Sequence, residues 1–228
     1  MTTTAPTAEI RVLRHHHDTP LELLGAWLDE RGLAVRVIRP DRGDPVPADP
    51  RGWGGLVVLG AEHSVNAAKP AWIADEIELT RAAVDSGVPV LGLCFGGQVL
   101  ARVLGAAVGP ADGPSIGWRQ VAARPDSPAA GEWLHYNYET FPLPGGAESL
   151  AELDGASAAF RVGPHLGVQF HPEATPEIVH AWAALESDRL RALGLDPPRL
   201  IDADEERRSD ARERAFGLFD SWLDARGG

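Results

Sequence analysis

The single cysteine of this 228-residue chain lies where a predicted strand meets a predicted helix. The apolar run Val88–Leu93 has β-propensity and leads into Cys94, and Gln98–Leu104 is compatible with a helix. Gly92 and Gly96 permit the sharp turn of a Gly-x-Cys-x-Gly pattern, in which the backbone of the nucleophile is usually strained. The pattern is the thiol counterpart of the Gly-x-Ser-x-Gly nucleophile elbow, and the positive end of the following helix favours a thiolate. The alternative is a small buried cysteine without a chemical role.

A second motif, Gly-Val-Gln-Phe-His-Pro-Glu, ends at Glu173. Val168–Phe170 is typical of a short buried strand, and Pro172 is expected to end it. Alternate positions of an extended chain face the same side, so we expect Glu173 to lie beside His171 and to orient its ring. Together with Cys94 these residues form a nucleophile, a base and an orienting group. Two alternatives are a polar strand end without function and a zinc site, although no paired ligand spacing such as Cys-x-x-Cys is present.

Strand and helix patterns alternate along the first half of the chain, which predicts a mostly parallel sheet covered by helices on both faces. Right-handed crossovers place the loops after such strands on one edge of the sheet, so the turn after Gly60 and Cys94 are expected to meet there. Between Ile116 and Phe170 we expect shorter, antiparallel strands. Two helices are predicted: the first has Thr19 as its cap and ends before Gly32, and the second covers Ala71–Ser86. The predicted strands are Ile10–Leu13, Leu33–Ile38, Gly55–Gly60 and Val88–Leu93.

The C-terminal part is predicted to be helical. Thr175 and Pro176 have the residue types of a helix cap and a first helical position, and Gly194–Arg199 is a proline-containing break. Glu205–Leu223 is amphipathic, with one apolar stripe that we expect to pack on the body of the protein. A surface for a dimer or another partner is the alternative. The stripe consists of Ala215, Phe216, Phe219, Trp222 and Leu223.

Three further features have competing interpretations. The run His15-His16-His17 is expected to be a solvated loop, with a metal cluster as the alternative. Glu62 and His63 lie near the expected pocket, where contact with a substrate competes with a solvated loop. The tryptophans on helical segments are expected to belong to the core rather than to a stacking surface for sugars or bases; they are Trp27, Trp72, Trp182 and Trp222.

Four segments resemble, in the same order, motifs of the class I glutamine amidotransferases, of the stand-alone kind similar to the glutaminase domain of GMP synthetase. The resemblance runs from about Ile10 to about Leu185 and implies a flavodoxin-like, three-layer α/β/α fold with a mostly parallel central sheet. The length of the chain predicts a single domain over residues 1–228, and the resemblance implies a catalytic core of about residues 10–185, followed by a helical extension of about 186–228. The matching segments are Val57–Val65, Pro89–Gln98, Ile116–Trp118 and Gln169–Glu173.

The resemblance implies hydrolysis of the side-chain amide of glutamine, or of a γ-glutamyl compound, through a cysteine thioester that releases ammonia or an amine. Cys94 would attack the amide carbon, His171 would transfer the proton to the leaving amine, and Glu173 would orient His171. Three further positions would complete the site, and neither a metal nor a cofactor is implied. They are the N–H of Phe95 and the Gly60–Ala61 turn as oxyanion donors, and Gln98 as a contact for the amino-acid end of the substrate.

Four positions depart from the family pattern and are expected on loops near the pocket mouth. The first is Ala61, which stands where the family has a second glycine; at positive φ it would cost about 1–2 kcal/mol, or the peptide would shift. The departures would change the preference from glutamine to another γ-glutamyl substrate, or they are neutral drift. The other three are Ser115, Asn137 and Ala158.

Composition is consistent with a compact enzyme. The formal net charge is −12 and the isoelectric point is about 5.0, which disfavours binding to nucleic acid or to anionic membranes. A single cysteine suits a reducing cytoplasm, and we see neither a signal peptide nor an apolar run long enough to span a bilayer. No nucleotide-binding loop is evident, so ammonia transfer would need a separate synthetase subunit.

Two other classes of function stay open. One is a non-catalytic binding or regulatory protein that kept the fold, because a fold does not guarantee an activity. The other is a relative of the elbow-cysteine stress proteins and peptidases. A homodimer is also compatible with the sequence.

Overall fold

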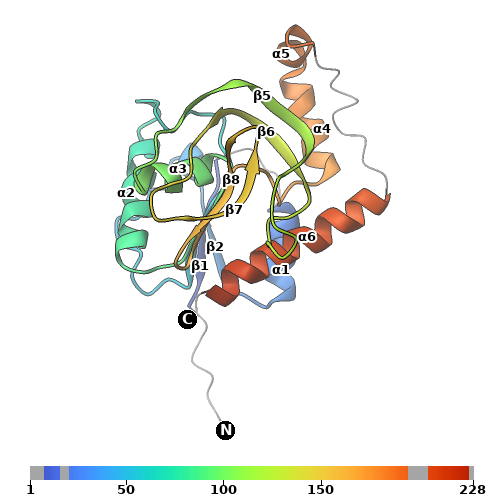
Figure 1. The fold of residues 1–228 in the computed structure, drawn as a ribbon. Coiled ribbons are helices and arrows are strands. Elements are labelled where there is room, and N and C mark those ends of the chain that lie inside the picture. The colour runs from blue at the N-terminus through green and yellow to red at the C-terminus, as the bar shows by residue number, and fades with distance from the viewer. Residues whose placement is uncertain (1–7, 16–20, 195–204, 226–228) are drawn as a thin grey trace.

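The computed structural model describes residues 8–15, 21–194 and 205–225. It has the expected α/β architecture, in which a seven-stranded sheet runs in the order β2-β1-β3-β4-β9-β8-β7 (Figure 1). The five strands from β2 to β9 are parallel, and β8 and β7 are antiparallel additions. The strands are β1 (Ile10–Leu13), β2 (Val35–Ile38), β3 (Gly55–Val58), β4 (Val90–Leu93), β7 (Glu148–Leu153), β8 (Ala156–Val162) and β9 (His165–Val168).

Helices cover both faces of this sheet, as Figure 1 shows. α1 and α6 lie on one side, and α2 and α3 lie on the other. The helices are α1 (Glu22–Glu30), α2 (Trp72–Asp85), α3 (Phe95–Val103), α4 (Pro176–Leu185), α5 (Ser187–Ala192) and α6 (Glu205–Asp224), and a short 3₁₀ turn, η1 (Pro40–Arg42), follows β2.

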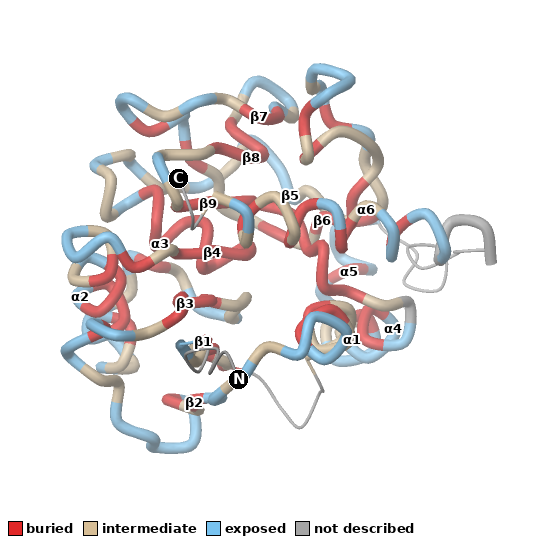
Figure 2. Tube along the Cα trace, turned by 90° about the horizontal axis from the view of Figure 1, so that it is seen from below, coloured by how far each residue is buried: buried red, intermediate tan, exposed pale blue. Residues whose placement is uncertain are grey.

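The apolar character of the central strands follows from this layering. All four residues of β3 are buried because each faces a helical layer. Val57 packs into the cluster that contains α1 and α6, and its neighbours Leu56 and Val58 pack into the cluster that contains α2 and α3. Figure 2 shows β3, β4 and β9 as buried segments inside the molecule. The edge strand β2 is only partly buried.

The segment before β9 is antiparallel, as predicted, but its strands are not short. β5 (Gly109–Gln120) and β6 (Glu132–Thr140) have 12 and 9 residues and form a separate two-stranded ribbon. The start of β5 contains glycines and prolines, residue types that favour turns. The ribbon accommodates them by a shift of register between Pro110 and Ser115. The ribbon arches over the end of the molecule that carries α4 and α5 (Figure 1).

The apolar stripe of α6 packs on α1 of the same chain, as expected. Phe219 and Trp222 are fully buried, and both rings lie against Trp27 of α1. The indole N–H of Trp27 also donates a hydrogen bond of 2.8 Å to Asp220. These contacts join the C-terminal helix to the first helix.

Two helix starts differ in detail from the expectation. α1 begins at Glu22, and Thr19 lies outside the described residues, as does most of the Gly194–Arg199 break. Thr175 occupies the cap position of α4, but its hydroxyl donates to Glu22 at 2.8 Å instead of capping the helix. The side chain of Glu22 therefore links the starts of α1 and α4.

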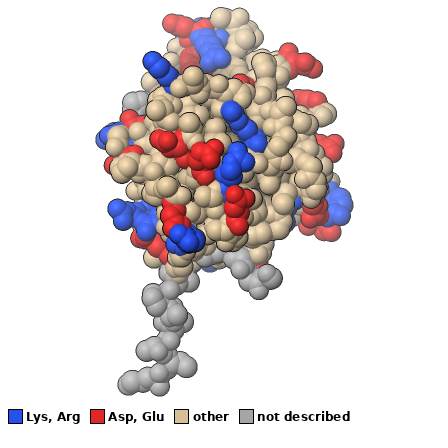
Figure 3. Space-filling view, turned by 90° about the vertical axis from the view of Figure 1, so that its left-hand side faces the viewer, with Lys and Arg blue, Asp and Glu red and all other residues tan. Residues whose placement is uncertain are grey.

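Charge is mixed on the face drawn in Figure 3, where acidic and basic side chains lie next to one another. No described helix has the length and apolar character that crossing a bilayer requires.

Candidate functional site

Cys94 occupies the tight turn between β4 and α3. Its backbone has φ 51° and ψ −107°, a conformation that a residue with a side chain rarely adopts. A Cβ atom on Gly96 would overlap the carbonyl oxygen of Val58, so only glycine permits α3 to lie this close to β3. The backbone N–H of Cys94 donates to the carbonyl of Val168 on β9 at 2.9 Å. This turn is the predicted elbow, and it leaves Cys94 at the C-terminal edge of the sheet.

His171 and Glu173 contact one another, but not along a strand. β9 ends at Val168, and the chain from Gln169 onward turns, which corrects the expected strand over Val168–Phe170. The backbone N–H of His171 donates instead to Leu134 of β6 at 2.8 Å, so pairing with another strand bends the chain here. Within the turn, His171 Nδ1 lies 2.8 Å from Glu173 Oε1. The predicted contact is present, although the geometry that produces it is different.

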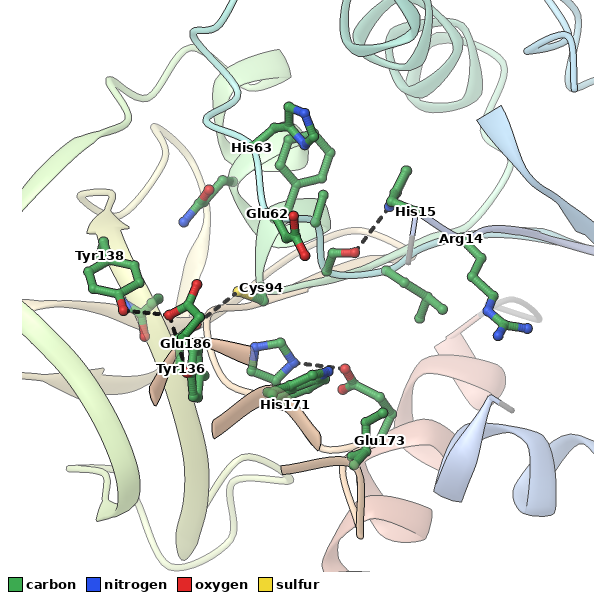
Figure 4. A pocket seen from close by; sticks show the side chains of 18 of the residues that line it. Arg14, His15, Glu62, His63, Cys94, Tyr136, Tyr138, His171, Glu173 and Glu186 are labelled. Carbon is green, nitrogen blue, oxygen red and sulfur yellow. Dashed lines mark hydrogen bonds and ion pairs between the residues drawn. The ribbon is translucent and has the colours of Figure 1, made fainter. Parts of the chain in front are cut away.

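The second ring nitrogen of His171 is buried. Burial lowers the pKa of His171, but the charges of Cys94 and Glu173 outweigh burial and raise this pKa well above its ordinary value. Figure 4 shows the ring of His171 between Cys94 and Glu173. The ring therefore has one nitrogen on the Glu173 carboxylate, and Cys94 acts on the ring through its charge and a hydrogen bond.

Gly60 lies against both the cysteine and the histidine. A Cβ atom placed on Gly60 would be 3.1 Å from Cε1 of His171 and 3.8 Å from Cβ of Cys94. The following residue, Ala61, is not at positive φ; among the described non-glycine residues only Glu22, Cys94 and Asp154 are. The strain that an alanine would suffer at positive φ is therefore absent from this turn.

Gln98 belongs to a buried pair of amides beside the sulfur. Its side-chain nitrogen donates to Gln169 Oε1 at 3.2 Å and to the carbonyl of Glu139 at 3.3 Å. Gln169 in turn donates from Nε2 to Cys94 Sγ at 3.7 Å. Gln169 belongs to the motif that ends at Glu173, but the sequence alone indicated no role for it. Only the tertiary structure shows that it contacts the thiol.

A cavity of about 320 Å³ connects these groups, and its lining includes Cys94, Phe95, Gln98, His171 and Glu173. Gly60 and Ala61 also line it, as do Glu62 and His63, whose position near the pocket was expected. All the residues that the sequence put forward for the site are thus brought together (Figure 4).

The mouth of the cavity is built from β6 and from α4 and α5. The hydroxyls of Tyr136 and Tyr138 both donate to Glu186, at 3.2 and 2.8 Å. Burial, helped by the hydrogen bond to Glu186, raises the pKa of Tyr138 to about 12. Arg189 stacks 3.6 Å from the centre of the Tyr138 ring, and Trp182 packs on the ring of His171 with centroids 4.8 Å apart. Trp182, which was expected in the core, packs against the buried cluster of α4 and also lines the cavity.

Ala61 lies in the turn after β3 and lines the cavity, as expected, whereas the other three departures from the family pattern lie on strands rather than on loops. Ser115 on β5 pairs with Asn137 on β6, and Ala158 is buried in β8. Of these three, only Asn137 lines the cavity.

His15 was expected to be solvated and is buried instead. Its Nε2 atom lies 2.6 Å from Glu76 Oε1, and its Nδ1 atom lies 3.1 Å from the carbonyl oxygen of Gly60. The signal that sequence reasoning missed is position, because His15 follows β1 at the same sheet edge as Gly60 and Cys94. His16 and His17 lie outside the described residues. Within the described part of the chain, no group of three metal-ligating side chains comes together.

Comparisons with known proteins agree with this geometry. The model of the family described as glutamine amidotransferase class-I matches residues 17–181. A GMP synthase (glutamine-hydrolysing) of Thermomicrobium roseum is 37% identical over 132 residues, which cover 53% of this chain and 25% of that protein. One of Vibrio vulnificus is 34% identical over 101 residues, covering 40% and 20%. The chain thus spans no more than about a quarter of these two relatives.

Solved structures share the fold over nearly the whole chain. The crystal structure of a glutamine amidotransferase from Methylobacillus flagellatus superposes with a TM-score of 0.85 at 25% identity, covering 97% of this chain and 96% of that one. A glutamine amidotransferase from Thermotoga maritima has a TM-score of 0.85 at 22% identity, covering 95% and 98%, and supports the fold alone.

Proposed function

The chain belongs to the glutamine amidotransferase class-I family, and on that premise we propose that it hydrolyses the side-chain amide of glutamine, or of a γ-glutamyl compound, through a thioester on Cys94. One observation carries the proposal. Cys94, His171 and Glu173 line the same cavity, and Gly60 touches the first two. A nucleophile, a base and an orienting carboxylate in one pocket form the general arrangement for covalent catalysis.

In the first half of the reaction, the Cys94 thiolate attacks the amide carbon and the carbonyl oxygen takes up the negative charge. The imidazolium of His171 gives its proton to the amide nitrogen, and the C–N bond breaks with release of ammonia or an amine. The carboxylate of Glu173, 2.8 Å from Nδ1, orients the ring and stabilises its positive charge. The product is a γ-glutamyl thioester.

Two backbone N–H groups are proposed to bind the oxyanion. Phe95 is the first residue of α3, so its N–H has no acceptor within the helix and lies directly after the nucleophile. The second donor is the N–H of Ala61 in the turn that contacts Cys94 and His171. A single oxyanion donor is typically worth about 3–4 kcal/mol.

In the second half, His171 accepts a proton from a water molecule, which attacks the thioester carbonyl. Glutamate leaves and the thiolate–imidazolium pair is restored. The proposed role of Gln98 changes in the light of its contacts. Because its amide nitrogen is already bonded to Gln169 and Glu139, we assign Gln98 to holding Gln169 beside the sulfur rather than to binding the substrate.

Intact-mass spectrometry with a glutamine-analogue diazoketone tests the proposal. Wild-type protein is expected to gain one adduct that excess glutamine blocks, and Cys94→Ala is expected to gain none. Because Cys94 is the chain's only cysteine, an adduct on the variant would report reaction elsewhere. Absence of both an adduct and ammonia release from the wild type would favour a non-catalytic binding protein.

For the substrate, we propose a γ-glutamyl amide larger than glutamine. The lining also includes Tyr138, Glu186 and Arg189, which have no part in the proposed bond-making steps, so we expect the cavity to have room for a substituent on the amide nitrogen. Steady-state rates on glutamine and on a panel of γ-glutamyl amides decide this point. A higher kcat/KM for glutamine than for every amide of the panel would remove the larger substrate.

Ammonia delivery to a synthetase is the competing version of the function. The curated relatives are GMP synthases, and this chain corresponds to only part of their length. In this version a synthetase would receive the ammonia. Strong dependence of the glutaminase rate on such a partner would favour this version.

A further inference from the structure

A buried hydrogen-bonded chain leads from helix α2 to the Gly60 turn. Glu76 on α2 is fully buried, and its Oε1 atom lies 2.6 Å from Nε2 of His15. The other nitrogen of His15 lies 3.1 Å from the carbonyl oxygen of Gly60. Neither Glu76 nor His15 has a part in the proposed bond-making steps. Burying a carboxylate and an imidazole is costly unless they are paired, so this placement calls for an explanation.

The partners define the direction of the hydrogen bonds. A carbonyl oxygen only accepts, so Nδ1 of His15 must carry the proton that faces Gly60. At Nε2, either His15 donates to the Glu76 carboxylate or a protonated Glu76 donates to the ring. Burial raises the pKa of Glu76, and contact with His15 opposes that rise. In both states the proton on Nδ1 stays in place, so Glu76 fixes the tautomer of His15.

Aromatic rings hold the imidazole from two sides. Trp72 stacks on His15 with ring centroids 4.8 Å apart, and Phe95 meets it edge-on at 5.4 Å. Phe95 is also the residue whose N–H is proposed to bind the oxyanion. His15 therefore touches the residues on both sides of the proposed oxyanion site.

The geometry of the peptide bond connects His15 to the pocket. In a trans peptide the C=O of Gly60 and the N–H of Ala61 point in opposite directions. Since His15 holds the C=O, the N–H of Ala61 points away from His15. Gly60 faces Cys94 and His171, since a Cβ atom on it would be 3.8 Å from Cβ of Cys94 and 3.1 Å from Cε1 of His171, and Ala61 lines the same cavity, so we infer that the N–H of Ala61 is directed into the cavity. A hydrogen bond to the carbonyl also polarises the peptide and strengthens the N–H as a donor.

We propose that His15, fixed by Glu76, is a positioning residue that locks the Gly60–Ala61 peptide with the Ala61 N–H directed at the oxyanion. The proposal rests on the proposed function of the site. It explains how the turn keeps a donor in place although Ala61 replaces a glycine. Rotation of this peptide would break the bond to His15 and remove the donor from the pocket.

A matched pair of variants tests the proposal, because asparagine places its amide nitrogen near Nδ1 of histidine and glutamine places its amide nitrogen near Nε2. His15→Asn keeps the donor to Gly60, and we expect kcat within about fivefold of wild type. His15→Gln keeps only the contact with Glu76, and we expect kcat to fall by about 10²–10³, the usual loss for one oxyanion donor, with KM unchanged. Glu76→Gln is expected to resemble wild type, and Glu76→Leu to resemble His15→Gln.

The rate of alkylation of Cys94 by iodoacetamide distinguishes loss of the oxyanion donor from general damage to the site. General damage would slow this reaction, whereas loss of the donor would not. This displacement uses the thiolate and forms no oxyanion, so its rate is expected to stay within about twofold of wild type in all four variants. Equal losses of kcat in His15→Asn and His15→Gln, a rise in KM at constant kcat, or slower alkylation in parallel with kcat would each overturn the proposal.

The NMR amide resonance of Ala61 tests the positioning role of His15 independently of the amide hydrolysis. The amide resonance of Ala61 is expected to be single and sharp in wild type and His15→Asn, and shifted or exchange-broadened in His15→Gln. If wild type does not turn over amides but the Ala61 resonance follows this order, the function is wrong and the positioning is right. An Ala61 resonance that is the same in all three proteins overturns the positioning, whatever the activity.

Discussion

Nδ1 of His171 lies 2.8 Å from Oε1 of Glu173, and both side chains line the cavity that contains Cys94. The charge of Cys94 and, next to it, this contact with Glu173 raise the pKa of His171 well above its ordinary value. In the proposed mechanism the carboxylate stabilises the positive charge of the ring. The same contact leaves Nε2 as the nitrogen that faces the pocket.

Replacing Glu173 by glutamine is expected to lower kcat by about 10². The amide can still accept a hydrogen bond from Nδ1, but it cannot stabilise the imidazolium, and general acid–base groups contribute about 10²–10⁴-fold to the rate. The pKa of His171, followed by its ring resonances, is expected to fall in the same variant. Glu22→Gln is a matched control, because it makes the same change in the same cavity without touching His171. Equal losses in both variants would contradict the assignment.

Backbone strain at Cys94 predicts that a glycine variant is more stable than an alanine variant. The residue has φ 51° and ψ −107°, and a conformation of this kind costs about 1–3 kcal/mol for a residue with a side chain. Glycine at Cys94 removes this strain, whereas alanine keeps it. We therefore expect Cys94→Gly to be more stable than Cys94→Ala by about 1 kcal/mol in denaturant unfolding, after the larger chain entropy of unfolded glycine is subtracted. A glycine variant that is the less stable of the two would show that the turn is unstrained.

The opposite outcome is expected at Ala61, which is not at positive φ. Glycine relieves no strain here and adds entropy to the unfolded chain. Ala61→Gly is therefore expected to lose about 0.5–1 kcal/mol of unfolding free energy, with kcat little changed because His15 still holds the peptide. A gain in both stability and kcat would show that alanine distorts the turn.

His135 predicts a loss of stability in mild acid. Burial, together with the positive charge of His171, lowers the pKa of His135 to about 4, whereas an unfolded histidine titrates near 6.5. The unfolded chain therefore binds the proton first, and stability falls as the pH decreases from about 6.5 to about 4. At pH 5 the loss is about 2 kcal/mol relative to pH 7.5.

Unfolding of wild type and His135→Gln at these two pH values isolates the contribution of His135. The variant is expected to lose about 2 kcal/mol less than wild type on acidification. The other charged groups that act on His135 are Arg119 and Asp154, and both are unchanged in the variant. Identical pH dependence in the two proteins would mean that His135 is not the group that titrates.

Some of the fold was predictable because local sequence patterns carried it. The apolar runs of β3 and β4 predicted buried parallel strands, and the glycines around Cys94 predicted the elbow, since only glycine permits so close a contact between α3 and β3. The stripe on α6 predicted its packing against the body. The division into a core of about residues 10–185 and an extension of about 186–228 stays a prediction.

Other features depended on contacts between distant segments. The turn that joins His171 to Glu173 arises because the backbone N–H of His171 donates to the carbonyl of Leu134 on β6. No local sequence pattern predicts this contact. The ribbon of β5 and β6 is long because its two strands pair with each other despite the glycines and prolines.

By itself, the sequence determined that a cysteine, a histidine and a glutamate would be available at strand ends of an α/β protein, because steric demands and hydrophobic patterns are local. Only the tertiary structure decided which polar groups support them. His15, Glu76 and Gln169 gained their contacts from the packing of separate elements around one sheet edge. Burial of a polar side chain depends on what the rest of the chain places over it, and that information is not local.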